Sequence, residues 1–340
     1  MGSAHCPLRV WFWAALVALA ACQRPRPPQP AAAPPTDLGR ALVVDGPLDA
    51  RLAPPDGARL VLLYGAEERG DPAPCGCADD PKGGVARQAA YVHATRAANP
   101  QAAVLWLNAG GWMLDAADFS GGPRADARTA NTGMVAAFAA GGLDAANLGY
   151  GDMMGLRSLE GATPPFPVLS ANVSGPALAS HAVVETGGLR IGIIGLTTQG
   201  SAAVPTAPYV TADPYRAGAS AASALRAQVD RVVLLSAGAG DAARRIAEDG
   251  LVDVVIDANT HHGNYPPLRV GSAVWVRAHF QTERMGELRI GGGEGSPTWA
   301  LDRQIDLDDD VPEQPEVETI VREVRRALKK ERQALFGERD

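Results

Sequence analysis

The chain has 340 residues, of which 46% are apolar and 20% are charged, and its formal net charge is −7. This apolar fraction suits a globular protein with a sizeable core, organised as one large or two small domains. No basic cluster stands out in the sequence, which argues against nucleic-acid binding. The 38 glycines and 27 prolines are dispersed rather than periodic, which argues against a fibrous repeat.

The N-terminal residues have the pattern of an export signal. Arg9 supplies a positive charge, and residues 10–21 form an apolar run that is too short for a permanent membrane span. The run ends in Leu19-Ala20-Ala21-Cys22, which resembles the bacterial lipobox. The resemblance implies that residues 1–21 are a signal peptide and that Cys22 is lipidated.

Residues 22–37 are rich in proline and alanine, which predicts a tether without regular secondary structure. We therefore expect a protein held to a membrane of the cell envelope by its lipid, with its folded part in the periplasm or at the cell surface. Gln23 follows the modified cysteine, whereas aspartate at that position is associated with retention in the inner membrane. The outer membrane is therefore favoured.

The folded part begins near residue 38, and apolar runs alternate with alanine-rich stretches along it. Strands are expected at residues 59–64, 103–107, 145–148, 166–171, 189–196, 231–235 and 252–256. Helices are expected at residues 85–99, 131–141, 215–229 and 241–249. Residues 273–280 and 286–290 are expected to form a closing hairpin of edge strands. Strands that alternate with helices predict a layered α/β fold.

The main domain is expected to span residues 38–300. An acidic stretch at 301–314 predicts a solvated linker, and a last helix is expected within residues 315–340. In that helix the apolar residues recur at helical spacing, so one apolar stripe must pack on another element. These residues are Val317, Ile320, Val321, Val324 and Leu328.

Polar side chains follow the buried strand at 252–256. Asp257, Asn259, His261 and His262 stand at its carboxyl end, the edge at which α/β sheets bind their ligands. Carboxylate and imidazole groups are common metal ligands, so this stretch alone predicts a metal site. Adjacent histidines on a strand end point in different directions, so both rarely bind one ion.

Four segments carry a resemblance to a known family. They are Gly83-Gly84-Val85-Ala86-Arg87, residues 166–173, residues 189–197 and residues 253–261. In order and spacing they resemble the N-terminal domain of bacterial 5'-nucleotidases, within the calcineurin-like metallophosphoesterases, over about residues 60–290. The resemblance implies a four-layered α-β-β-α sandwich. It also implies two divalent metals, held by Asp, His and Asn side chains at strand ends, that activate water against a phosphate ester.

The ligand positions depart from the family pattern almost everywhere. The first strand is followed by Glu67 and Glu68 without the family's Asp-x-His, and Gly111 stands at the bridging aspartate. Gly151 replaces the catalytic histidine, and only His261 keeps a family ligand. The positions of the former cleft are Asn108, Gly111, Tyr150, Asp152, Asn172, Ala237 and Asn259.

These departures predict a metallophosphoesterase-like protein without its two-metal centre, which needs no cofactor and acts as a binding or scaffold protein. The alternative is an active phosphoesterase that holds Mn²⁺ or Zn²⁺ in a rebuilt site. Its residues would be Asp115, Asp152, Asn172, Asp257 and His261. The nucleotidases also carry a substrate-specificity domain, and the roughly 50 residues after Ile290 are too few for one, which weakens nucleotide hydrolysis as an expectation.

A second alternative rests on Cys75-Gly76-Cys77. After removal of Cys6 and lipidation of Cys22, only Cys75 and Cys77 remain in an oxidising compartment. A C-x-C disulfide is strained, so the pair could form a redox-active bond, stay reduced, bind a soft metal, or link to a partner. An envelope protein is the expected partner, through this loop or through the C-terminal helix.

Overall fold

The computed structural model describes residues 42–54, 56–77, 80–115, 126–198, 207–261, 265–291 and 299–336. All of them belong to one compact unit, Asp37–Asp340. The expected signal peptide, the whole expected tether, the lipidation site Cys22 and His262 lie outside the described residues. Within the described part, no helix has both the length and the apolar character needed to cross a membrane.

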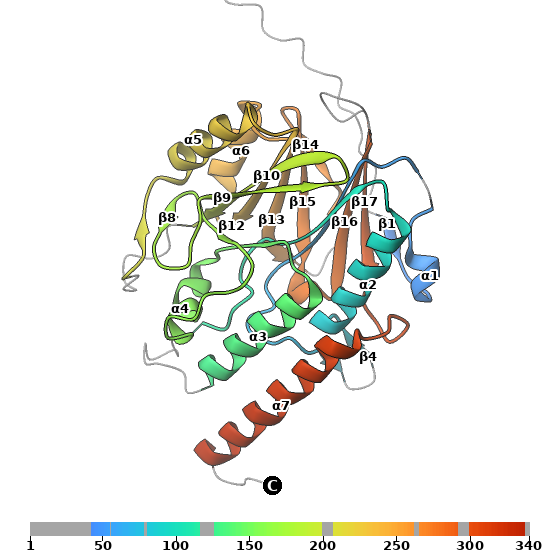
Figure 1. Ribbon diagram of the computed structural model, residues 1–340, viewed down its shortest axis with the longest axis vertical. Helices are drawn as coiled ribbons and strands as arrows, with labels where there is room; N and C mark the ends of the chain where they lie inside the picture. Colours follow the sequence, from blue (N-terminus) through green and yellow to red (C-terminus); the bar gives the residue numbers. More distant parts are fainter. Residues whose placement is uncertain are drawn as a thin grey trace, which may run out of the picture. The chain divides into compact units, whose positions relative to one another are not determined.

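The larger of two main sheets has seven strands (Figure 1). Their order is β1 (Leu42–Val44), β17 (Trp299–Asp306), β16 (Arg284–Gly291), β2 (Leu60–Gly65), β5 (Ala103–Asn108), β6 (Ala145–Asn147) and β7 (Val168–Leu169). The strands β2, β5, β6 and β7 are parallel, whereas β16 is antiparallel to both of its neighbours. The carboxyl ends of the four parallel strands therefore meet at one edge.

The second sheet has six strands, and its centre is parallel as well. Their order is β14 (Leu268–Val270), β15 (Ala273–His279), β13 (Val254–His261), β12 (Arg231–Ala237), β10 (Leu189–Thr197) and β9 (His181–Thr186). Both edge strands, β9 and β14, run antiparallel to their neighbours. Two small two-stranded sheets complete the strands: the hairpin of β3 (Cys75–Cys77) with β4 (Asp80–Lys82), and β8 (Val173–Ser174) paired with β11 (Val210–Thr211).

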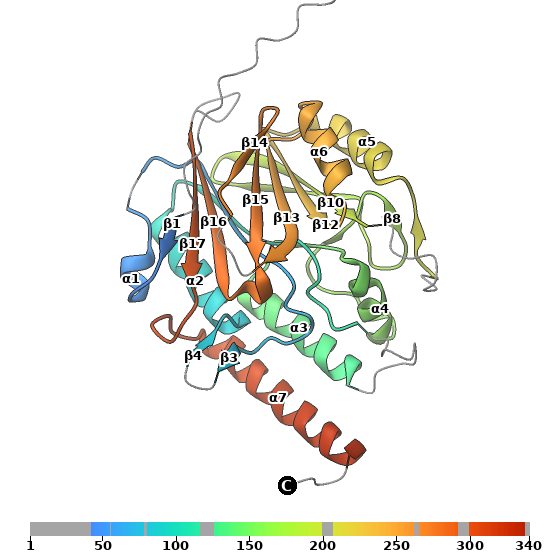
Figure 2. The same ribbon diagram turned by 180° about the vertical axis from the view of Figure 1, so that it is seen from behind.

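Helices cover the outer faces of both sheets, as Figures 1 and 2 show. On the seven-stranded sheet these are α2 (Val85–Ala98), α3 (Ala127–Gly141), α4 (Tyr150–Ser158) and α7 (Pro315–Phe336). On the six-stranded sheet they are α5 (Pro214–Arg226) and α6 (Gly240–Glu248), while the short α1 (Leu48–Arg51) follows β1. Separate apolar clusters fill the three spaces between the layers. The predicted four-layered α-β-β-α sandwich is confirmed.

The predicted closing hairpin is wrong. Its two strands exist as β15 and β16, but they belong to different sheets, and neither is an edge strand. The turn η1 (Phe280–Thr282) redirects the chain between the sheets through positive φ angles at Gln281 and Thr282. Two strands that are adjacent in sequence and separated by a short turn therefore do not pair.

The predicted linker at 301–314 is also wrong in its first half, because Trp299–Asp306 forms β17. The charged residues of this stretch gave it the composition of a solvated segment, so it was not predicted as a strand. Asp302 accepts a hydrogen bond from the Tyr64 hydroxyl at 2.7 Å, and Arg303 forms a buried ion pair with Glu287 at 2.7 Å. Polar residues can line a buried strand when each of them finds a partner.

Candidate functional site

The former cleft lies where the carboxyl ends of both sheets meet. Strand β6 of the first sheet contacts β10 and β12 of the second, and a pocket of about 360 Å³ opens beside these strand ends. Of the predicted cleft residues, Gly111, Tyr150 and Ala237 line this pocket. Glu67 and Arg69 line it too. We call this space the strand-end pocket.

The Glu67 carboxylate fills the place beside Gly111. A Cβ atom added at Gly111 would lie 2.3 Å from Glu67 Oε1, and the φ angle of Gly111 is +76°. Glu67 is itself held in place, because its backbone N–H donates to the Gly110 carbonyl at 3.0 Å. Where the family has its bridging aspartate, this chain therefore has a glycine at positive φ with the Glu67 carboxylate beside it, so a side chain there would be strained and would have to displace Glu67.

A guanidinium neutralises this carboxylate. Arg69 Nε donates to Glu67 Oε2 at 2.9 Å, and the guanidinium carbon lies 5.3 Å from the centre of the Phe280 ring. Burial raises the pKa of Glu67, and the bond to Arg69 opposes that rise. The Glu67–Arg69 pair was not predicted from the sequence, although Glu67 to Arg69 stand where the family has Asp-x-His.

Behind this pair, Glu68 is buried in a hydrogen-bonded group. Its carboxyl accepts from Asn108 Nδ2 at 2.7 Å and from the Thr282 hydroxyl at 2.6 Å. Burial raises the pKa of Glu68, and both hydrogen bonds lower it. Asn108 also accepts from the Gly110 N–H at 2.9 Å. The polar groups of Asn108 are thus used to hold the ends of β2 and β5 together.

Asp152 is a clamp rather than an exposed ligand. The residue is fully buried, and its carboxylate accepts backbone N–H bonds from Gly149, Gly111 and Met113 at 2.6, 2.9 and 2.8 Å. Burial raises the pKa of Asp152 to about 7, although the three N–H bonds oppose the rise. The carboxylate therefore joins the loop after β5 to the loop after β6.

Asn172 and Asn147 tie the two sheets to each other. Asn172 donates to the Thr197 carbonyl and accepts from the Thr197 N–H, both at 2.9 Å. Asn147 Nδ2 donates to the carbonyls of Ala109 at 2.9 Å and Leu196 at 3.0 Å. Asn172, one of the residues of the rebuilt-site alternative, therefore has a structural role here.

The end of β13 does not bring the remaining candidates into one group. Asp257 alternates with Ala258, which lines the strand-end pocket, so the Asp257 side chain lies on the opposite face of the sheet. There it faces Arg277 Nε at 3.6 Å. The backbone of His261 pairs with His279 beyond a bulge, and the side chains of Asn259 and His261 lie outside the described residues.

Asp115, the last member of the rebuilt-site alternative, is exposed and lines the pocket. Among the side chains that the structure describes, no group of three His, Cys, Asp or Glu residues is arranged to hold a metal ion. The described members of the alternative site therefore do not converge on one point.

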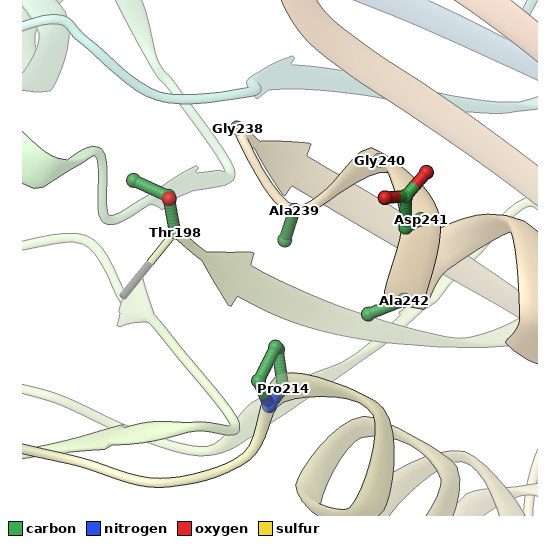
Figure 3. Close-up of a pocket in the computed structure, with 7 residues that line it drawn as sticks. All are labelled: Thr198, Pro214, Gly238, Ala239, Gly240, Asp241 and Ala242. Atoms are coloured by element: carbon green, nitrogen blue, oxygen red, sulfur yellow. The ribbon is translucent and has the colours of Figure 1, made fainter. Parts of the chain in front are cut away.

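A second hollow of about 370 Å³ adjoins the strand-end pocket and shares Thr198 and Gly238 with it. Figure 3 shows its walls, where Thr198 and Asp241 carry the polar side chains and Pro214 closes one side. Helix α6 begins here without a side-chain cap at Ala239. On this side of the cleft, alanine stands at the former ligand position 237, and the side chain of Asn259 lies outside the described residues.

The thiol of Cys75 lies in the β3–β4 hairpin. It is free, and its Sγ is 3.1 Å from the Gln281 side-chain oxygen. The side chain of Cys77 lies outside the described residues. The expected disulfide or soft-metal role of Cys75 and Cys77 therefore stays a prediction.

No protein-family model matches the chain, and no curated protein matches it. Solved structures do. The 5'-nucleotidase precursor from Thermus thermophilus aligns with a TM-score of 0.64 and 22% identity, covering 82% of this chain and 60% of its own. The NAD nucleotidase NadN from Haemophilus influenzae aligns with a TM-score of 0.64 and 18% identity, covering 82% of this chain and 61% of its own.

The calcineurin-like phosphoesterase YfkN from Bacillus subtilis aligns with a TM-score of 0.59 and 16% identity, covering 81% of this chain and 99% of its own. The chain thus has an α/β metallophosphoesterase fold. More particularly, its fold is shared with 5'-nucleotidases, of which it spans about 60% of the length. The resemblance seen in the sequence is confirmed at the level of the fold.

Proposed function

We propose that this chain is a non-catalytic binding or scaffold protein of the cell envelope, built on a metallophosphoesterase fold. The observation that carries the proposal is the Glu67 carboxylate beside Gly111, paired with the Arg69 guanidinium. A carboxylate and a guanidinium occupy space that the family resemblance assigns to a bridging aspartate and its metals. The lipobox-like segment ending at Cys22 supports the envelope location and the lipid anchor.

Charge and geometry both support the loss of hydrolysis. A two-metal centre needs several anionic or imidazole ligands that surround both ions and leave a water molecule between them. Here Glu67 is neutralised by Arg69, while Glu68 and Asp152 are committed to hydrogen bonds within the protein. Without bound metal, none of the described groups in the pocket would lower the pKa of water into the neutral range.

The test combines metal analysis with an activity assay. The purified chain is incubated with Mn²⁺ or Zn²⁺, desalted, analysed for bound metal, and assayed with bis-p-nitrophenyl phosphate and with a nucleoside monophosphate. We expect no stoichiometric metal and no metal-dependent turnover. The matched variant is His261→Ala, which removes the one retained family ligand. Metal-dependent turnover that disappears in His261→Ala would overturn the proposal in favour of the active alternative.

A further inference from the structure

Helix α7 is fixed in its rotation about its own axis. Its apolar stripe, which includes Val317, Val321 and Val324, is buried against the helices that cover the seven-stranded sheet. The contact with α3 is close, because a Cβ atom added at Gly133 would lie 2.2 Å from a methyl group of Val324. Near the other end of α7, the Thr129 hydroxyl donates to Glu331 at 2.6 Å. The opposite face of α7 is therefore turned to solvent.

That outward face is strongly basic in a chain whose formal net charge is −7. At about 100° per residue, its basic side chains fall within an arc of roughly 140° on the side away from the apolar stripe. Two acidic residues lie close to this arc. Glu318 forms an ion pair with Arg322 at 3.0 Å, and Glu323 lies at the border of the arc. We call this set the α7 basic face, and all of its members are exposed: Arg322, Arg325, Arg326, Lys329 and Lys330.

The shape of this surface suits a broad, flat partner. A helix of 22 residues is about 33 Å long. Figures 1 and 2 both show α7 outermost in its layer, with its C-terminal turns extending past the end of α3. A row of long basic side chains on an outermost helix can contact a plane along its length, without insertion into a groove.

We propose that the α7 basic face rests on the anionic lipid headgroups of a bilayer. Lys and Arg side chains near an anionic leaflet are attracted to its surface potential, and the attraction grows with the number of charges. The proposal draws on the envelope location proposed above, which would keep the folded unit close to a membrane. The expected tether, residues 22–37, could extend to at most roughly 55 Å.

The test uses a chain that starts at residue 22 and carries Cys22→Ser, so that no lipid can anchor it. Sedimentation with phosphatidylcholine vesicles, with and without phosphatidylglycerol, measures binding. We expect binding to the anionic vesicles only, and its loss at high salt, where screening shortens the reach of charges to a few ångströms. The variant Arg325→Gln/Arg326→Gln/Lys329→Gln/Lys330→Gln should bind at least about a hundred-fold more weakly.

The matched control changes net charge equally, at exposed arginines on other elements. Arg59→Gln/Arg190→Gln/Arg216→Gln/Arg244→Gln should retain vesicle binding, and circular dichroism should show both variants folded. Equal losses in the two variants would overturn the proposal, as would equal binding to neutral vesicles. Binding to polyglutamate without binding to anionic vesicles would also overturn it and would assign the face to an acidic protein. A failure here would leave the non-catalytic proposal intact, because that proposal is tested by metal content and turnover.

Discussion

The two sides of the cleft have lost the family's ligand pattern in different ways. On the side of the seven-stranded sheet, the loops after β2, β5 and β6 are filled and cross-linked, with Glu67 against Gly111 and Asp152 bonded to three backbone N–H groups. On the side of the six-stranded sheet, small residues such as Ala237 and Ala258 line open space. We call the first the filled side, and we call the second the emptied side for its described residues, since the side chains of Asn259 and His261 lie outside them.

The largest expected effect concerns the clamp on the filled side. Asp152→Ala would leave three backbone N–H groups without an acceptor, two of them buried and the third, of Gly111, partly buried, and each fully buried loss costs about 1–3 kcal/mol. We expect the free energy of unfolding, measured with urea, to fall by about 3–6 kcal/mol. On the emptied side, Ala258→Ser serves as the matched control and should change the free energy of unfolding by less than about 1 kcal/mol. Similar losses in both variants would remove the contrast between the two sides.

The pH dependence of stability should report the same clamp. Burial raises the pKa of Asp152 from 3.8 to about 7, so the folded chain binds this proton more tightly than the unfolded chain. The contribution of Asp152 to stability should therefore be greatest below pH about 4, and it should be lost as the pH rises to about 7, a change of about 4 kcal/mol for this group.

A second buried carboxyl acts in the same direction. The pKa of Asp302 is also raised by burial to about 7. Asp152→Asn should therefore reduce the slope of stability against pH without abolishing it, and Asp302→Asn should do the same. Urea unfolding between pH 4 and pH 8 measures the slope for the wild type and for each variant, and a slope that is unchanged in Asp152→Asn would contradict the expected effect.

On the filled side, restoring the family's aspartate at position 111 should destabilise the protein. Gly111→Asp places a Cβ atom 2.3 Å from Glu67 Oε1 at a positive φ, so we expect a loss of about 2–3 kcal/mol. Glu67→Ala in the same chain should recover part of the loss in a double-mutant cycle. Ala237→His, on the emptied side, should cost less, about 1 kcal/mol. If the two restorations proved equally costly, the difference between the sides would not hold.

The smallest expected effect comes from Arg69→Ala. Because the Arg69 side chain is 57% exposed, its ion pair with Glu67 contributes less than about 1 kcal/mol to stability. Its loss should instead raise the pKa of Glu67 further, since Arg69 opposes the effect of burial. Carbon-detected NMR titration of the Glu67 carboxyl measures this, with Arg69→Lys as the conservative comparison. An unchanged pKa would show that the pair does not form in solution.

The sequence predicted the layers better than the cleft. Expected strands such as 103–107 and 231–235 are apolar except for Arg231, and the structure places them inside the sheets as β5 and β12. Strand β17 escaped prediction because Asp302 and Arg303 look solvated until Tyr64 and Glu287 are known to be their partners.

The cleft depends on contacts that are distant in the sequence. Loss of the ligands could be predicted, because Gly111 and Ala237 carry no ligating group. The filling of the cleft could not be predicted. Glu67 and Gly111 are 44 positions apart in the sequence, and they meet only after β2 and β5 have paired. The basic side of α7 was hidden for a related reason, since acidic and apolar residues separate its charges until the helix gathers them on one side.

The ties between the sheets have a consequence for recognition. Asn172 joins the loop after β7 to β10, and Asn147 bridges a carbonyl just after β5 and a carbonyl of β10. The Thr282 hydroxyl holds Glu68 at the corner where the chain crosses between the sheets. With these bonds in place, the two walls cannot hinge apart or close without breaking buried hydrogen bonds. A ligand that enters the cleft must therefore fit a gap of fixed width. The cleft would discriminate between ligands by its preformed shape rather than by closing around them.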